Sequence, residues 1–240
     1  MTTRLVTLTL MILAATPAGH ASAAVRVLHD QAHGQAPPPG QLAPIAQRLG
    51  LEIVPSNRAI TPATLDGVDI LYLRAPSQPF TADEKEAIVA FVRKGGSLFL
   101  VLDEERRQSL SGTGVNDLIA PFGLRLTPDH KAPHNTGALA RAGEIHKADR
   151  EVPYSGGRAV EGGTPFSFVM GADGRPSDVA HGAFTKLDSG GRIVVLGDAM
   201  VTLFMGSQQG ERLQGRTAQD TVYWGKDSGI FMEEISEWLK

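Results

Sequence analysis

The chain has 240 residues, of which 42% are hydrophobic and 20% charged, a composition typical of globular proteins and unlike that of disordered or fibrous chains. Its 23 Lys and Arg against 26 Asp and Glu give a net charge of -3, so no basic excess is present to neutralise a phosphate backbone. Nucleic acid is therefore not an expected partner. The sequence contains no Cys, which excludes disulfides, thiolate zinc sites and a Cys nucleophile.

Residues 1–23 have the features of a secretory signal peptide: Arg4, the apolar stretch Leu5–Ala15, and a small-residue cleavage site at Ala21-Ser22-Ala23. We expect cleavage before Ala24 and a periplasmic or secreted product. The alternative is a transmembrane anchor, but the apolar stretch is too short to cross roughly 30 Å of hydrocarbon. No later segment reaches the roughly 18 apolar residues of a membrane helix, so we expect no membrane span in the mature chain.

The first half of the chain alternates short apolar runs, typical of buried strands, with amphipathic segments. The predicted strands are Val25–Leu28, Leu51–Val54, Ile70–Leu73 and Ser97–Leu102. The predicted helices are Leu42–Leu49, a helix with its N-cap at Thr61-Pro62, and a helix opened by the capping box Thr81–Glu84. Gly95-Gly96 follows this last helix, and we expect one of the two to adopt a positive φ.

Residues 127–176 contain many Gly and Pro and no sustained period, which predicts loops and short hairpins forming an irregular insertion or lid. Two later strands, Ala180–Leu187 and Arg192–Leu196, are expected to pair antiparallel at a sheet edge. A helix with Ile230 to Leu239 at helical spacing closes the chain. The predicted fold is a single three-layer α/β domain of flavodoxin-like type over residues 24–240, with a mostly parallel sheet and an antiparallel edge.

Four segments carry a resemblance to a known family. They are FTADEKEAIVAFVRKGGSLFLVLDEE, His29-Asp30-Gln31-Ala32-His33-Gly34, RIVVLGDAMV and IFMEEISEWL. In this order the chain resembles the class I glutamine amidotransferase-like superfamily, and in particular a Cys-less branch that includes the domain shared by gliding-motility accessory proteins and an intraflagellar transport subunit. The likeness covers most of residues 25–240 and is poor in the middle.

The resemblance implies a fold without the superfamily's chemistry. Its catalytic members place a nucleophilic Cys at the sharp turn after the strand that corresponds to Ser97–Leu102, with His and Glu downstream. This chain carries Leu102-Asp103-Glu104 at that turn, so thioester chemistry has no nucleophile and we expect no glutaminase activity.

Open α/β sheets bind ligands beyond the carboxyl ends of their strands, and polar residues follow several predicted strands here. The candidate ligand-binding residues are Asp30, His33, Asp103, His181 and Asp198. Carboxylates and imidazoles either bind a divalent metal or offer hydrogen-bond acceptors to a polyhydroxylated ligand. The alternative is structural: Asp30 and Asp198 cap neighbouring segments, and the histidines bond to the backbone.

Other motifs give weaker indications. Gly112-Thr113-Gly114 lacks the third glycine of a dinucleotide fingerprint, no G-x-S-x-G motif occurs, and we expect no cofactor. The acidic run Asp103 to Glu105 offers either an acid/base pair for glycoside hydrolysis or a solvated turn. The remaining candidates are residues that line a lid or pocket, or belong to the core: His130, His134, His146, Tyr223 and Trp224.

Two functions remain open. The first is an exported, non-catalytic amidotransferase-like domain that binds a small molecule, a glycan or an envelope protein at the carboxyl edge of the sheet. The second is a metal-assisted or carboxylate-based hydrolase of envelope or extracellular carbohydrate.

Overall fold

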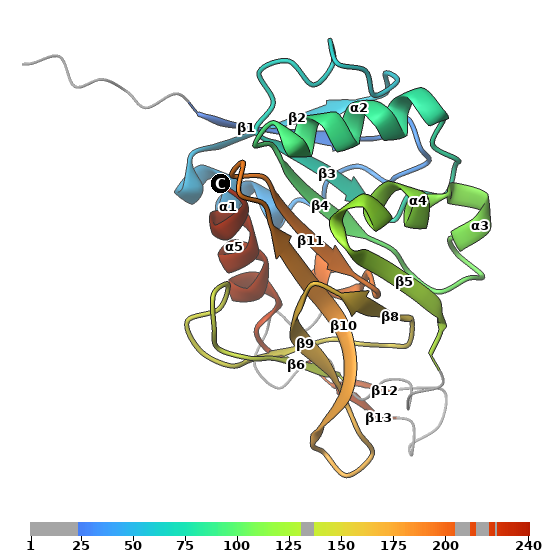
Figure 1. Cartoon of the computed structure of the whole chain (residues 1–240). Coiled ribbons are helices and arrows are strands. Elements are labelled where there is room, and N and C mark those ends of the chain that lie inside the picture. The colour runs from blue at the N-terminus through green and yellow to red at the C-terminus, as the bar shows by residue number, and fades with distance from the viewer. Residues whose placement is uncertain (1–23, 131–136, 205–211, 215–220, 224) are drawn as a thin grey trace, which may run out of the picture.

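The computed structural model describes residues 24–130, 137–204, 212–214, 221–223 and 225–240 (Figure 1). The predicted signal peptide, His134 and Trp224 lie outside these residues. Within the described chain, no helix is both long enough and apolar enough to cross a membrane.

A nine-stranded sheet with the order β2-β1-β3-β4-β11-β10-β9-β6-β7 forms the centre of the molecule. Its first five strands run parallel: β2 (Leu51–Ser56), β1 (Val25–Asp30), β3 (Ile70–Arg74), β4 (Ser97–Val101) and β11 (Arg192–Leu196). The other four continue antiparallel: β10 (Pro176–Lys186), β9 (Thr164–Met170), β6 (Ala138–Ala140) and β7 (Arg150–Val152). The predicted α/β class is confirmed.

The antiparallel part of the sheet is larger than the sequence indicated. The predicted antiparallel pairing of β10 with β11 is confirmed, but its place at the sheet edge is wrong because β11 lies between β4 and β10. The segment 127–176, expected to be irregular, supplies β6, β7 and β9 to the same sheet. Strands of three residues, such as β6 and β7, are too short to show a sequence period.

Helices pack on both faces of the sheet (Figure 1). Helices α1 (Leu42–Leu49) and α5 (Ser228–Leu239) cover one face, where they pack with side chains such as Tyr72 and Phe99. Helices α2 (Ala82–Arg93) and α4 (Val115–Ile119) cover the other, against Leu71 and Leu98. Because helices cover both faces, β3 and β4 are buried along their whole length.

The start and end of α2 match the prediction. Thr81 Oγ1 accepts from the Glu84 amide at 3.2 Å, and Glu84 Oε2 accepts from the Thr81 amide at 3.0 Å. Gly95 has φ +105°, which confirms the expected positive φ after the helix. Gly96 is needed for another reason, since a Cβ there would lie 2.3 Å from the Phe91 ring.

The helix predicted after Thr61-Pro62 is wrong, because residues 61–67 form turns. Thr61 Oγ1 accepts from the Thr64 amide at 3.2 Å, and Thr64 Oγ1 accepts from the Thr61 amide at 2.7 Å. These local hydroxyl contacts satisfy the amides without a helix. Gly67, at φ +66°, then turns the chain toward β3.

Smaller elements complete the structure. They are α3 (Leu110–Thr113), the 3-10 helices η1 (Ala120–Phe122) and η2 (Met200–Leu203), and the strand pairs β5 (Leu124–Asp129) with β8 (Arg158–Gly162) and β12 (Arg212–Gln214) with β13 (Thr221–Tyr223).

Candidate functional site at the carboxyl edge of the sheet

The parallel strands bring three predicted carboxylates to one edge of the sheet. Asp30 ends β1, while Asp103 and Asp198 each lie two residues beyond the ends of β4 and β11. The parallel pairing of β1, β3, β4 and β11 fixes this common edge. His181 lies in the middle of β10, where its carbonyl accepts from the Gly197 amide at 2.8 Å.

Asp30 and His33 form a buried cluster with Glu84. His33 Nδ1 lies 2.8 Å from Asp30 Oδ2, and His33 Nε2 lies 3.3 Å from Glu84 Oε2. Asp30 Oδ2 also accepts from Gln35 Nε2 at 2.5 Å, and Asp30 Oδ1 accepts from the Ala32 amide at 3.1 Å. The His33 ring stacks on Phe80 with 4.1 Å between centroids. These contacts join the end of β1 to the start of α2.

Charges inside this cluster stabilise one another. Burial disfavours the imidazolium of His33, but the hydrogen bond to Asp30 and the charges of Asp30 and Glu84 outweigh it and raise the pKa of His33. Burial likewise opposes ionisation of Glu84, whereas the amides of Thr81 and Ile60 hold the pKa of Glu84 below its usual value. Asp30 and Glu84 therefore favour the protonated form of the His33 ring that lies between them.

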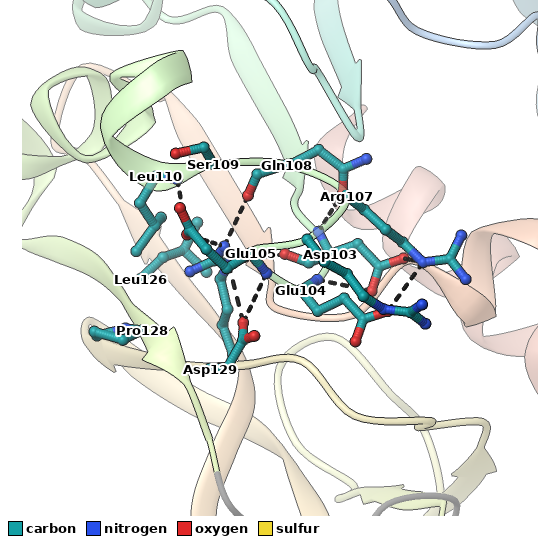
Figure 2. Close-up of polar contacts among 12 residues, drawn as sticks. Asp103, Glu104, Glu105, Arg107, Gln108, Ser109, Leu110, Leu126, Pro128 and Asp129 are labelled. Carbon is teal, nitrogen blue, oxygen red and sulfur yellow. Dashed lines mark hydrogen bonds and ion pairs between the residues drawn. The ribbon is translucent and has the colours of Figure 1, made fainter.

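The turn that follows β4 is closed by its own backbone and side chains (Figure 2). Asp103 is buried, its Oδ1 accepts from the Glu104 amide at 2.9 Å, and its amide donates to Gln108 Oε1 at 3.1 Å. Arg107 Nε lies 3.6 Å from Asp103 Oδ2 and 3.0 Å from Glu104 Oε1. Burial raises the pKa of the Asp103 carboxyl.

The side chain of Arg158 in β8 is fully buried and donates hydrogen bonds to this turn. Its Nε donates to the Asp103 carbonyl at 2.8 Å, and its Nη2 donates to Glu105 Oε2 and to the Gln108 carbonyl, both at 2.7 Å. Its Nη1 donates to the Thr127 carbonyl at 3.2 Å. This role could not be predicted from the sequence, because Arg158 stands alone in a glycine-rich stretch and its partner Asp103 is distant along the chain.

Asp198 shares this part of the edge with Asp103. Its Oδ2 accepts from the Ser155 amide at 3.0 Å and from Ser155 Oγ at 3.3 Å, and its Oδ1 accepts from the Met200 amide at 2.7 Å. Burial, followed by the charge of Asp103, raises the pKa of Asp198 to about 7. A carboxyl group that holds its proton near neutral pH is thus placed beside a second carboxyl.

His181 belongs to the core. Its ring is fully buried and meets the Tyr154 ring edge-on at 5.5 Å between centroids. Burial lowers the pKa of His181 to about 4, so the ring is neutral at pH 7. Among the described contacts, none joins His181 to the other four candidates.

The candidates therefore fall into two pairs, Asp30 with His33 and Asp103 with Asp198, and the separate His181. None of them lines any of four cavities of the described chain, those beside Phe91, Tyr72, Phe168 and Trp238. Among the described residues, no group of three or more His, Asp or Glu is arranged to hold a metal ion. Their role in ligand binding stays a prediction.

His146, considered for a lid, is instead packed under α5. Its ring stacks on Phe231 at 4.8 Å, and its Nδ1 lies 2.9 Å from Glu234 Oε2. His130 was also a candidate for the lid. Its backbone amide donates to the Gly157 carbonyl at 2.8 Å.

The family described as "Domain of unknown function (DUF4350)" matches residues 35–203. The chain belongs to this family. Human "Intraflagellar transport protein 52 homolog" is 31% identical to this DUF4350 protein over 110 residues, which are 43% of this chain and 24% of that protein. The DUF4350 chain thus matches only about a quarter of that relative's length.

Two solved structures share the fold. The "mmIFT52 N-terminal domain" superposes with a TM-score of 0.66 at 18% identity, covering 89% of the DUF4350 chain and 96% of that domain. A "Putative thua-like protein" from Bacteroides uniformis gives a TM-score of 0.50 at 11% identity and covers 94% of this chain and 95% of the other. These two structures show that the chain has a fold similar to that of the mmIFT52 N-terminal domain and of the thua-like protein.

Proposed function

We propose that this DUF4350 domain is an exported, non-catalytic binding domain of the Cys-less amidotransferase-like branch, with a three-layer, flavodoxin-like arrangement. Of the ligands that the sequence left open, a small molecule, a glycan or an envelope protein, we propose an envelope protein. The proposed contact surface is the carboxyl edge of the sheet. The observation that supports the proposal is the acidic turn after β4, which begins at Asp103 and is held by internal hydrogen bonds.

At that turn, catalytic members of the superfamily present their nucleophile to substrate. Here Asp103 is buried, and Arg158 and Gln108 hold the backbone of the turn. Opening a substrate pocket at this point requires breaking the contacts of a buried guanidinium, which is costly. The geometry therefore favours binding on the outer rim of the edge over chemistry inside it.

The outer rim of the carboxyl edge, here Arg106 and Leu203, carries exposed side chains suited to a protein contact. The Arg106 side chain is 72% exposed, and Leu203 of η2 is 42% exposed. Arg74 Nε donates to Thr202 Oγ1 at 3.1 Å and so fixes η2 against the end of β3. Arginines and large apolar side chains on a rigid support are enriched at protein interfaces.

Site-specific photo-crosslinking tests the surface. A photoreactive residue replaces Arg106 at the carboxyl edge or, as the matched control, the exposed Arg93 at the end of α2. We expect an envelope-protein adduct from position 106 that is absent from position 93 and is lost when Leu203→Asp is added. No adduct at position 106, or the same adduct at both positions, contradicts the proposal.

An ammonia-release assay tests the absence of catalysis. The purified protein is expected to release no ammonia from glutamine above the rate of the buffer. Release that is lost on Asp103→Ala substitution would show that the turn is catalytic.

One observation favours a second candidate, a carboxylate-based hydrolase of envelope or extracellular carbohydrate. Asp198, with a pKa of about 7 beside Asp103, has the protonation of a general acid at neutral pH. Its test is hydrolysis of peptidoglycan and of aryl glycosides by the purified protein. The hydrolase candidate predicts turnover that Asp198→Asn abolishes, whereas the binding domain predicts none in either protein.

A further inference from the structure

Arg74, the last residue of β3, is a buried cation that has no carboxylate partner among the described residues. It is 7% exposed and lies at the carboxyl edge of the sheet. Arginine is rarely buried unless its charge is paired, because removing a charge from water is costly. Buried Arg158 follows this rule, with Glu105 at 2.7 Å. The charge of Arg74 is left for a group from outside the described chain.

The contacts of Arg74 leave one end of its guanidinium free. Its Nε donates to Thr202 Oγ1 at 3.1 Å, and its Nη1 donates to the Pro37 carbonyl at 3.4 Å. Its Nη2 donates to no described residue, and solvent reaches this atom, since it is not one of the buried atoms that lack a partner. The second Nη1 donor and both Nη2 donors are therefore available side by side, and such a pair of nitrogens matches the two oxygens of a carboxylate.

The groups around Arg74 position it without neutralising it. Thr202 is an uncharged acceptor whose own hydroxyl donates to a backbone carbonyl at 2.7 Å. Burial, followed by the charge of Arg74, lowers the pKa of His29 to about 4, so the His29 ring is neutral at pH 7. The carboxylate of Asp30, in the neighbouring strand β1, pairs with His33. A ligand at Arg74 therefore meets one positive charge beside an uncharged ring.

The backbone is strained on both sides of the contact between Arg74 and Thr202. Within the described chain, two residues other than glycine have a positive φ: Ala75 at +53°, next to Arg74, and Phe204 at +58°, two residues after Thr202. This conformation is unfavourable for a residue with a Cβ, and it persists where the surrounding structure enforces it, most often at functional sites. Here the Ala75 amide donates to the Val101 carbonyl at 2.8 Å, and Phe204 is buried in the core. The strain supports a binding role for the pair.

We propose that Arg74 is a carboxylate-binding site, whose Nη1 and Nη2 hold the side-chain carboxylate of an Asp or Glu of a partner protein. That the carboxylate belongs to a protein rests on the proposed function, which places a protein contact at the adjacent Leu203; the carboxylate chemistry does not. A phosphate fits less well, because Asp103 and Asp198 at the same edge repel a double negative charge more strongly than a single one.

NMR of the Arg74 Nε–H group measures carboxylate binding directly. The probe is N-acetyl-glutamate N-methylamide, and the matched control is N-acetyl-glutamine N-methylamide, which has the same shape and no charge. We expect the glutamate probe to shift the Arg74 signal and to leave the signal of the exposed Arg93 in place. We expect no shift from the glutamine probe and a smaller shift from the glutamate probe at high salt.

Other anions test the source of the carboxylate. Succinate and inorganic phosphate are titrated at the same ionic strength as the glutamate probe. Succinate that binds more than about tenfold tighter than the probe would identify a free acid as the ligand and overturn the protein source. Phosphate that binds tighter than the probe would overturn the preference for a carboxylate.

Substitutions test the paired donors. Arg74→Gln is expected to weaken binding of the glutamate probe by about tenfold or more. Arg74→Lys, which keeps the charge and loses the paired donors, is expected to weaken it as well. Arg93→Gln, at the end of α2, leaves binding unchanged. Circular dichroism checks folding, and the comparison of the two probes on the wild-type protein is decisive if a variant of Arg74 does not fold.

The proposal is overturned if the glutamate probe does not shift the Arg74 signal, if the glutamine probe shifts it equally, or if Arg74→Gln and Arg93→Gln lose binding equally. Photo-crosslinking at position 106 separates this result from the proposed function. An envelope-protein adduct without a probe shift at Arg74 contradicts the carboxylate site alone. A probe shift without an adduct confirms the carboxylate chemistry and overturns the protein source.

Discussion

Arg158 shows how much of this structure depends on single buried charges. Its guanidinium is fully buried and donates to three carbonyls and to Glu105, so it joins β5, β8 and the turn after β4. Hydrogen bonds to Ser109 and Arg158 lower the pKa of Glu105 to about 2, which keeps this carboxylate charged.

Arg158→Leu is expected to destabilise the protein by about 3 to 5 kcal/mol, because it leaves buried carbonyls without a donor. Arg125→Leu, which removes an exposed ion pair with Glu161, is expected to cost about 1 kcal/mol or less. Urea unfolding of both variants measures the difference. Similar losses in the two would show that the buried contacts of Arg158 are not what stabilises the turn.

Asp198 makes stability depend on pH. Its pKa is about 7 in the folded protein and about 3.9 in an unfolded chain. The folded state therefore holds more protons between these values, and the contribution of Asp198 to stability is full below pH 4 and is lost as pH rises through 7. Asp198→Asn removes this loss. The stability of the variant relative to wild type should therefore rise with pH by about 2 to 4 kcal/mol.

The effect of Asp198 has to be read from the difference in unfolding free energy between wild type and Asp198→Asn, because histidines titrate in the same pH range. Burial lowers the pKa of His29 and His181 to about 4, and these rings add stability as pH rises. They are present in both proteins and cancel. A wild-type minus variant difference that stays flat from pH 4 to 8 would contradict the assignment to Asp198.

At the scale of elements, Glu84 serves two structures at once. It closes the capping box of α2 through Thr81, and the same carboxylate meets His33 from the loop after β1. A residue expected only to start a helix thus also positions part of the carboxyl edge.

Glu84→Gln keeps the shape of this side chain and removes its charge. The pKa of His33 is expected to fall toward its ordinary value, because one of the two carboxylates that stabilise the imidazolium is lost. NMR titration of the His33 ring measures the change, with the distant His146 as the internal control. An unchanged His33 titration would show that Glu84 does not act on it.

The sequence predicted elements best where local signals agreed. Leu42–Leu49 and Arg192–Leu196 have the predicted bounds, since apolar periodicity and flanking glycines coincide there. The helix predicted after Thr61-Pro62 does not form, because the Thr61 and Thr64 hydroxyls accept from the backbone amides locally. The edge positions of Asp30, Asp103 and Asp198 followed from strand ends, but Arg158 and Glu84 could not be found, because their partners at this edge are far away in sequence.

For the whole molecule, the sheet is parallel from β2 to β11 and antiparallel beyond β11. Its last edge is covered: the amides of Lys226 and Asp227 donate to the Glu151 carbonyl of β7 at 3.1 and 3.0 Å, and Asp227 Oδ2 accepts from the Glu151 amide at 2.8 Å. A covered edge resists uncontrolled strand pairing.

Residues 1–23 predict that the whole protein is exported. We expect mass spectrometry of the protein recovered from the envelope or medium to show an N-terminus at Ala24, because Ala21-Ser22-Ala23 fits the small-residue cleavage rule. An intact Met1, or a start far from Ala24, would contradict export by this route.

Hydroxyl-radical footprinting is the most direct test of binding at the carboxyl edge. Leu203 at that edge and Ile230 on α5 are 42% and 47% exposed, which makes them a matched pair of apolar reporters. Their oxidation rates are compared between the purified protein and the protein in its intact envelope. We expect the envelope to protect Leu203 and to leave Ile230 as reactive as in the purified protein. Equal reactivity of Leu203 in both settings, or protection of Ile230 alone, would contradict it.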